Sequence, residues 1–197
     1  IAVVDGSATY FYIQRMHPEY ELIPVKNAQD GFNMVSFSEA DALVADLSNV
    51  EALVLSHGHM DHFGGLLTLV EKVGKKNIEL VLHPKAFRKP RYIKVSEDSK
   101  IKLPSLTGEK IAAADISLVA SKDPRALLDG FLLFLGEIPK KTEFEKGFPR
   151  MYFDDEDGQS KWDPIEDDSA IVAHVRGKGL VILSGCAHSG IINTVKY

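Results

Sequence analysis

The sequence predicts a sheet-rich α/β layer protein, because short apolar segments typical of strands alternate with a few segments of helical spacing. Hydrophobic residues make up 45% of the 197 residues and charged residues 26%, which is the balance of an ordinary globular protein. A chain of this length can bury a sizeable core, so global disorder is not expected. The length favours a single domain spanning residues 1–197.

The first part of the chain is expected to alternate strands and helices. Apolar or loosely alternating runs predict strands, the first of them running into a turn, at 1–6, 22–25, 32–37, 52–55 and 78–82. Apolar residues at helical spacing predict helices at 39–46 and 66–73. The second helix is expected to end at Gly74. The strand at 52–55 is apolar throughout, as in strands that are buried on both faces.

The second part is less regular until its end. Residues 88–102 are basic and polar and are expected to form a surface excursion. A short helix is predicted at 109–114, and strands are predicted at 116–120 and 131–135. Acidic runs at 154–157 and 166–168 flank an expected polar loop. Two strands, 170–175 and 180–183, are joined through Gly177-Lys178-Gly179, which is a hairpin signal.

Composition excludes several function classes. The net charge of −5 argues against a surface that binds nucleic acid. No apolar run approaches the roughly 20 residues that span a bilayer, and no secretory leader is recognisable, so no membrane partner is expected. Cys186 is the single cysteine; it excludes an intrachain disulfide framework and fits a reducing compartment, so we expect a cytoplasmic protein.

The most informative segment is His57-Gly58-His59-Met60-Asp61-His62. In an extended segment, side chains two residues apart point the same way, so His57 and His59 can reach one ion together. Asp61 and His62 fall at the turn into the following helix, beside the first pair. Imidazole and carboxylate groups suit zinc, manganese or iron. The alternative is a solvated polar turn that is rich in histidine, but its position after a buried strand and before Gly64-Gly65 favours a metal site.

With this motif the chain resembles the metallo-β-lactamase superfamily. The branch it most resembles includes proteins named as methanopterin-related ribofuranosyl-aminobenzene phosphate synthases. The stretches that carry this closer resemblance are 136–139, 167–171 and 179–191. The resemblance implies an αββα sandwich with a pair of metal ions at one edge of its two sheets.

The resemblance also implies ligands. His57 and His59 would bind the first ion, Asp61 and His62 the second, and His188 would join them from the opposite sheet. Cys186 stands where many members carry a bridging aspartate; it would be either a thiolate ligand or a buried, packed residue. Asp168 lies where other branches place a histidine ligand, and it is either a ligand or an acid in a surface turn. One or two divalent ions are expected, zinc first, with manganese or iron as alternatives.

Two departures from the family pattern predict that residues are missing. No Asp-Thr-Gly-like turn precedes the histidine motif, so we expect an omitted loop near Ser36 and Phe37. The branch continues past the Gly-Cys-Ala-His segment, so we expect a missing C-terminal strand and helix. The sandwich would then be incomplete at its C-terminus, and the second metal ion would lack one ligand.

The leading hypothesis for function is metal-dependent hydrolysis of an ester, amide or phosphodiester-type bond in a small molecule. Two ions about 3.5–4 Å apart would hold a water and lower its pKa so that hydroxide forms near neutral pH. Asp61 could orient that water or take its proton, and it is the candidate catalytic residue. The alternatives are a biosynthetic enzyme acting on a pterin or phosphoribosyl-aromatic substrate, and a non-catalytic metal-binding protein. Di-iron redox chemistry is disfavoured, because iron-using relatives usually carry glutamate at the position of His59. A homo-oligomer stays open.

Other residues could each have either a structural or a functional role. His83 is expected to be a core histidine or to orient a ligand, rather than to bind an ion itself. The basic cluster, Lys85, Arg88, Lys89 and Arg91, would be either a solvated loop or a clamp for an anionic substrate such as a phosphate. Glu137 matches the branch but has no role that chemistry assigns. Tyr152 and Trp162 would either wall a pocket or cover the core.

Overall fold

The structure, a computed structural model, describes residues 2–4, 15, 19, 21–26, 43–44 and 50–197, which fall in two compact units, residues 1–50 and 51–197. In the first unit, β1 (Ala2–Val4) lies between β2 (Ile23–Val25) and β3 (Leu43–Val44), and all pairings are parallel. The strands predicted at the start of the chain and at 22–25 are confirmed. The helix predicted at 39–46 is wrong at Leu43 and Val44, because pairing with β1 overrides the local helical spacing. The strand predicted at 32–37 and the loop expected near Ser36 lie outside the described residues.

A parallel sheet with its helices forms one half of the second unit. Its strands are β4 (Ala52–Val54), β5 (Ile78–Leu82) and β8 (Ile116–Ala120), in the order β4-β5-β8. The helices are α3 (Met60–Phe63), α4 (Leu66–Val73) and α5 (Gly108–Ala112), with a 3₁₀ turn at Pro84–Phe87. The helix α4 buries Leu66, Val70 and Val73 and ends at Gly74, which has φ 65°, as its apolar spacing and glycine predict. The helix α5 begins at Thr107, whose side chain accepts a hydrogen bond from the backbone of Lys110.

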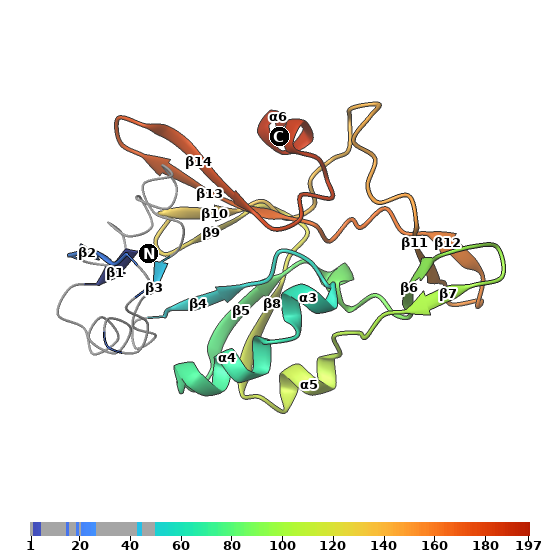
Figure 1. Cartoon of the computed structure of the whole chain (residues 1–197), viewed down its shortest axis with the longest axis horizontal. Helices are drawn as coiled ribbons and strands as arrows, with labels where there is room; N and C mark the ends of the chain where they lie inside the picture. Colours follow the sequence, from blue (N-terminus) through green and yellow to red (C-terminus); the bar gives the residue numbers. More distant parts are fainter. Residues whose placement is uncertain (1, 5–14, 16–18, 20, 27–42, 45–49) are drawn as a thin grey trace. The chain divides into compact units, whose positions relative to one another are not determined.

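An antiparallel sheet faces the parallel one. Its strands are β9 (Arg125–Leu127), β10 (Leu132–Phe134), β13 (Ala170–Val175) and β14 (Gly179–Ser184), in the order β14-β13-β10-β9. The hairpin predicted from Gly177-Lys178-Gly179 is the β13–β14 pair. Val81 of β5 packs with Leu127 and Phe134 of the antiparallel sheet, so the core lies between the two sheets. In Figure 1, α4 and α5 lie outside the parallel sheet, and α6 (Ile191–Lys196) lies beyond the antiparallel sheet. The unit is therefore layered helix, sheet, sheet, helix.

A third sheet replaces the expected surface excursion at 88–102. It contains β6 (Arg91–Lys94), β7 (Lys100–Lys102), β11 (Met151–Asp154) and β12 (Ser160–Trp162), in the order β12-β11-β6-β7. The expected surface excursion is wrong at Arg91 and Tyr92, which are buried at 2% and 3% exposure, whereas β7 is exposed as expected. The expected polar loop is interrupted by the exposed strand β12. Tyr152 stacks on Tyr92 at 6.2 Å, and Trp162 is 39% exposed.

Within the described residues, no helix is long and apolar enough to cross a membrane.

The core between the two sheets gives the first prediction. Phe134 is fully buried, so Phe134→Ala should lower the free energy of unfolding by about 3–5 kcal/mol through lost burial and a new cavity. Phe131, three residues earlier, is 63% exposed, and Phe131→Ala should change that free energy by less than about 0.5 kcal/mol. Urea unfolding measures both, and equal losses for the two variants would contradict the assignment of the core.

Candidate metal centre

The histidine motif lies where β4 ends and α3 begins. The backbone of Leu55 still pairs with Val81 of β5 at 2.9 Å, and the backbone at His59 is extended. His57 and His59 are both buried, and Nε2 of His57 lies 3.1 Å from Nδ1 of His59. The structure thus brings together the two imidazoles that the two-residue spacing predicts to be neighbours.

Gly58 is required because the backbone of another segment lies against it. A Cβ at this position would overlap the carbonyl oxygen of Ala86. The Gly58 N–H donates to Oδ2 of Asp167 at 2.7 Å. The loop that carries the two histidines therefore packs against the backbone at Ala86 and is hydrogen-bonded to Asp167.

His188 reaches the same place from the end of β14. Its ring centroid lies 4.8 Å from that of His57 and 5.0 Å from that of His59. Among the described residues, the Nε2 atoms of His59 and His188 are buried without a hydrogen-bond partner. Native structures rarely leave such atoms unpaired, and imidazole nitrogen is a common ligand of transition metals. The three imidazoles therefore fit a divalent ion.

The second group contains Asp61, His62 and Cys186. Nε2 of His62 lies 3.1 Å from Sγ of Cys186 and 3.6 Å from Oδ2 of Asp61. The ligand atoms of these three residues all lie within 4.8 Å of one another, and the same holds for His57, Cys186 and His188. Cys186 thus belongs to both groups, and it is exposed, so the alternative that it packs as a buried residue is wrong. A sulfur atom that belongs to two groups of potential metal ligands is the arrangement expected of a bridging ligand.

Asp168 is buried rather than part of a surface turn. Its Oδ2 accepts a hydrogen bond from the backbone of Ser189 at 2.7 Å. Its Oδ1 lies 3.8 Å from Nδ1 of His57 and has no hydrogen-bond partner in the described part of the chain. The surface-turn alternative is therefore wrong. Asp168 and His59 both lie beside the group formed by His57, Cys186 and His188. Neither residue belongs to that group or to the group of Asp61, His62 and Cys186.

Burial keeps the clustered imidazoles neutral. Desolvation, together with the neighbouring histidines, lowers the pKa of His57 to about 2. Desolvation and the charge of Arg91 lower the pKa of His59 to about 4, and desolvation also lowers the pKa of His188. Desolvation and the negative charges of Asp61 and Asp168 raise the pKa of the Cys186 thiol. The histidines are therefore ready to donate lone pairs at neutral pH, whereas the thiol would lose its proton on binding a cation.

Ser56 orients two of the imidazoles, a role that no pattern in the sequence indicates. Its Oγ lies 3.1 Å from Nδ1 of His57 and 3.2 Å from Nδ1 of His62. Ser56 thus contacts Nδ1 of each ring and not Nε2. Such hydrogen bonds to the second ring nitrogen commonly fix metal-binding histidines.

Most of the basic cluster forms ion pairs with an acidic segment. Arg91 donates to both carboxylate oxygens of Asp167 and, at 2.7 Å, to Asp163. The other pairs, at 2.5–2.6 Å, are Lys85 with Glu166, and Arg88 with Asp163 and Glu166. Three of the four cations, Lys85, Arg88 and Arg91, are therefore neutralised. They neither form a solvated loop nor remain free to bind an anionic substrate. Three acids at 163–167 were the signal in the sequence that could have found this pairing.

His83 is fully buried outside both groups, as a core histidine. Its Nε2 lies 3.2 Å from Oε2 of Glu137, and its Nδ1 accepts a hydrogen bond from the backbone of Lys85 at 3.1 Å. Glu137, which had no predicted role, thus partners His83.

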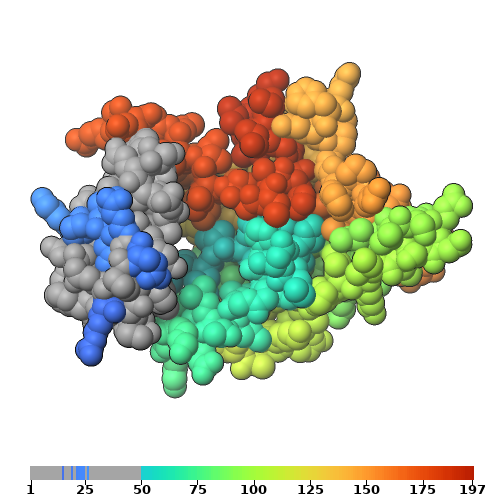
Figure 2. Space-filling model, in the orientation of Figure 1, coloured from blue at the N-terminus to red at the C-terminus, as the bar shows by residue number. Residues whose placement is uncertain are grey.

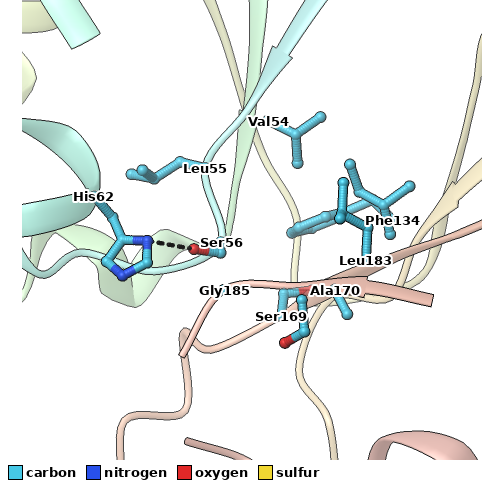
Figure 3. Close-up of a pocket in the computed structure, with 11 residues that line it drawn as sticks. Val54, Leu55, Ser56, His62, Phe134, Ser169, Ala170, Leu183 and Gly185 are labelled. Atoms are coloured by element: carbon cyan, nitrogen blue, oxygen red, sulfur yellow. Dashed lines mark hydrogen bonds between the residues drawn. The ribbon is translucent and has the colours of Figure 1, made fainter. Parts of the chain in front are cut away.

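An apolar cavity of about 340 Å³ opens beside His62 (Figure 3). Figure 3 shows the hydrogen bond between Ser56 and His62 at one side of it and Phe134 and Leu183 across from them. A second hollow of about 320 Å³ is lined by Cys186 and His188 together with residues 144–148. The metal centre is therefore bordered by two spaces of different character.

Comparison with known proteins agrees with this geometry. Residues 26–196 match the model of the family described as the Metallo-beta-lactamase superfamily. A protein of Methanocaldococcus jannaschii named 7,8-dihydropterin-6-methyl-4-(beta-D-ribofuranosyl)-aminobenzene-5'-phosphate synthase is 34% identical over 155 residues, which cover 75% of this chain and 50% of that protein. An uncharacterized protein of the same organism is 30% identical over 203 residues, which cover 99% of this chain and 72% of that protein. This chain thus spans about half the length of the named relative.

A solved structure shares the fold. The crystal structure of a metal-dependent hydrolase of the beta-lactamase superfamily superposes with a TM-score of 0.59 at 19% identity. The match covers 85% of this chain and 56% of the other. The expected fold is thereby confirmed.

The tie between Asp167 and Gly58 predicts a selective loss of metal affinity. Asp167→Asn and Asp163→Asn each remove a buried partner of Arg91, and each should lower the free energy of unfolding by about 3–5 kcal/mol. Only Asp167 touches the histidine loop, so only its substitution should also weaken zinc binding, by about 10–100-fold. Competition with a chelator and urea unfolding measure the two effects. Equal zinc affinity in both variants would contradict the tie.

The lowered histidine pKa values predict how stability depends on pH in the metal-free protein. Below pH 6.5 an unfolded histidine takes up a proton, whereas folded His57 and His59 stay neutral to about pH 2 and 4. The free energy of unfolding should therefore be highest above pH 6.5. As the pH is lowered below 6.5, it should decrease by about 1.4 kcal/mol per pH unit for each such histidine. Urea unfolding at about pH 7.5 and 5.5 measures this, and His59→Asn should reduce the slope. Equal stability at the two pH values would show that the imidazoles are not buried as described.

Proposed function

The chain belongs to the metallo-beta-lactamase superfamily, and from this premise we propose that it is a metal-dependent hydrolase acting on a small molecule. The observation that carries the proposal is the convergence of buried, neutral imidazoles with unpaired Nε2 atoms, those of His59 and His188, around His57. Such a set is costly to fold unless something binds to it. Zinc is the proposed ion, because neutral imidazole, thiolate and carboxylate are its preferred ligands.

We assign the ligands to two ions. His57 and His188 would hold the first ion, and Asp61 and His62 the second, with Cys186 shared between the two. His59 is assigned to the first ion as well, because it lies beside His57 and its Nε2 atom is unpaired. Asp168 is proposed as a further ligand of the first ion, because its free oxygen faces His57.

The reaction combines these ions with groups of the chain. When bound, the ions would lower the pKa of water and polarise the bond to be cleaved. The Asp61 side chain is 70% exposed beside His62, so as a ligand facing the water it can orient that water or accept its proton. Ser56 keeps the rings of His57 and His62 in place while this happens.

The arrangement fits ester, amide and phosphodiester cleavage alike, because activated water and a polarised oxygen serve all three. A cytoplasmic location is part of the proposal, since the free, exposed thiol of Cys186 stays reduced there.

A second candidate function is biosynthetic. The relative named as a synthase of a dihydropterin joined to a ribofuranosyl-aminobenzene phosphate is 34% identical over 75% of this chain. On the same scaffold this chain would act on a pterin or a phosphoribosyl-aromatic substrate. Turnover of such compounds without release of a hydrolysis product would favour this candidate.

Substitution of the proposed ligands tests the metal-dependent function. His59→Ala and Asp168→Asn should reduce the zinc content measured by mass spectrometry, and should lower turnover of bis-(p-nitrophenyl) phosphate and p-nitrophenyl acetate by at least about 100-fold. His174 is exposed on β13, so His174→Ala is the matched control and should leave both unchanged.

The outcomes separate the candidates. Full zinc content with no hydrolysis of either compound by the unmodified protein would favour the biosynthetic or the non-catalytic alternative. Wild-type zinc content in His59→Ala would contradict the ligand assignment.

A further inference from the structure

The hollow beside Cys186 and His188 has the composition of a ligand site. Its volume is about 320 Å³, which lies in the range of small-molecule sites, about 300–1,000 Å³. One wall consists of the two residues that belong to the metal centre. The other wall is the segment 144–148 of the long loop between β10 and β11. A molecule bound here would therefore lie against the proposed ions.

Two aromatic rings line this hollow without being packed into the core. Phe144 is 76% exposed and Phe148 is 37% exposed. Full burial of a phenylalanine ring is worth about 1.5–3 kcal/mol, so the largely exposed Phe144 ring beside the partly exposed Phe148 ring indicates a surface that is covered when a ligand is bound. Aromatic rings favour flat partners, on which they stack in offset or edge-to-face geometry.

The loop is held in place although its side chains are exposed. The Glu145 carboxylate accepts hydrogen bonds from the backbones of Ile192 and Asn193, and the Asn193 amide donates to the Glu145 carbonyl. A side chain at Gly190 would overlap Glu145, so that position leaves room for the contact. In Figure 2 the amber segment of the loop lies beside the red C-terminal segment. The rings are thus presented by a fixed backbone, which lowers the entropy lost on binding.

The hollow also contains an unneutralised positive charge. Lys146 is exposed and takes part in no ion pair among the described residues, unlike Lys85, Arg88 and Arg91. The Glu145 carboxylate in the same wall is engaged by two backbone N–H groups. Both Glu145 oxygens are thus occupied, whereas the Lys146 ammonium has no ion-pair partner among the described residues, so it is the charged group of this wall that can bind an anionic substituent.

We propose that this hollow binds the substrate of the metal centre, and that this substrate is a planar aromatic molecule with an anionic substituent. Phe144 and Phe148 take the ring, Lys146 takes the anionic group, and the bond to be cleaved faces Cys186 and His188. The assignment of this ligand as substrate rests on the proposed function. The apolar cavity beside His62 is a poorer candidate, because none of its lining residues is a lysine or arginine.

Binding of naphthalene-2-sulfonate tests the proposal without relying on turnover. Its ring system is planar, and its sulfonate is a weak metal ligand, so calorimetry on metal-free and zinc-loaded protein should give binding in both. Phe144→Ala and Lys146→Gln should each weaken this binding about tenfold. Phe131→Ala and Lys72→Gln, which change exposed residues elsewhere, are the matched controls and should leave it unchanged. Naphthalene-2-methanol, which lacks the charge, should bind equally to the wild type and to Lys146→Gln.

The outcomes are decisive in either direction. Equal binding by the wild type and Phe144→Ala, or no binding to metal-free protein, would overturn the proposal. A concentration-dependent dimer lost in Phe144→Ala would also overturn it, because a second copy would then cover the rings. Because binding is read in metal-free protein and the ions are counted separately, failure of this proposal is distinguishable from failure of the metal-dependent function.

Discussion

Two adjacent buried carboxylates hold the candidate metal centre together. Asp167 accepts a hydrogen bond from the backbone between His57 and His59, while Asp168 accepts one from the backbone just after His188. The next residue, Ser169, donates its N–H to the carbonyl of Ser56 at 2.9 Å. Three consecutive residues therefore join the end of β4 to the end of β14, one strand from each facing sheet. If they were displaced, the imidazoles would no longer converge.

This design has a thermodynamic cost that is consistent with a functional site. Buried ion pairs rarely stabilise a protein as much as apolar residues of the same volume, and Arg91, Asp163 and Asp167 are all almost fully buried. Imidazoles crowded at ring distances of 4.1–5.0 Å add unpaired polar atoms. A bound cation would satisfy those atoms and stabilise the folded chain by mass action.

Much of this architecture could be predicted from the sequence, but only where local pattern and tertiary role agree. The strand at 78–82 and the helix at 66–73 have apolar spacings that match their burial, and both are observed with those bounds. Strands β6 and β7 escaped prediction because Arg91 is buried by distant acids, which no local pattern shows. The histidine spacing likewise predicted that His57 and His59 meet. It could not show that Asp167 binds the backbone between them, because that contact joins segments 109 residues apart in the chain.

The central claim is that His57, His59 and His188 converge on a metal ion in the folded chain. The most direct test is a crystal structure of the zinc-loaded protein, with anomalous diffraction recorded on both sides of the zinc absorption edge. The account predicts an anomalous peak bonded to imidazole nitrogens of these three histidines, at about 2.0–2.1 Å from each. Imidazoles turned away from one another, or zinc found only at other sites, would contradict it.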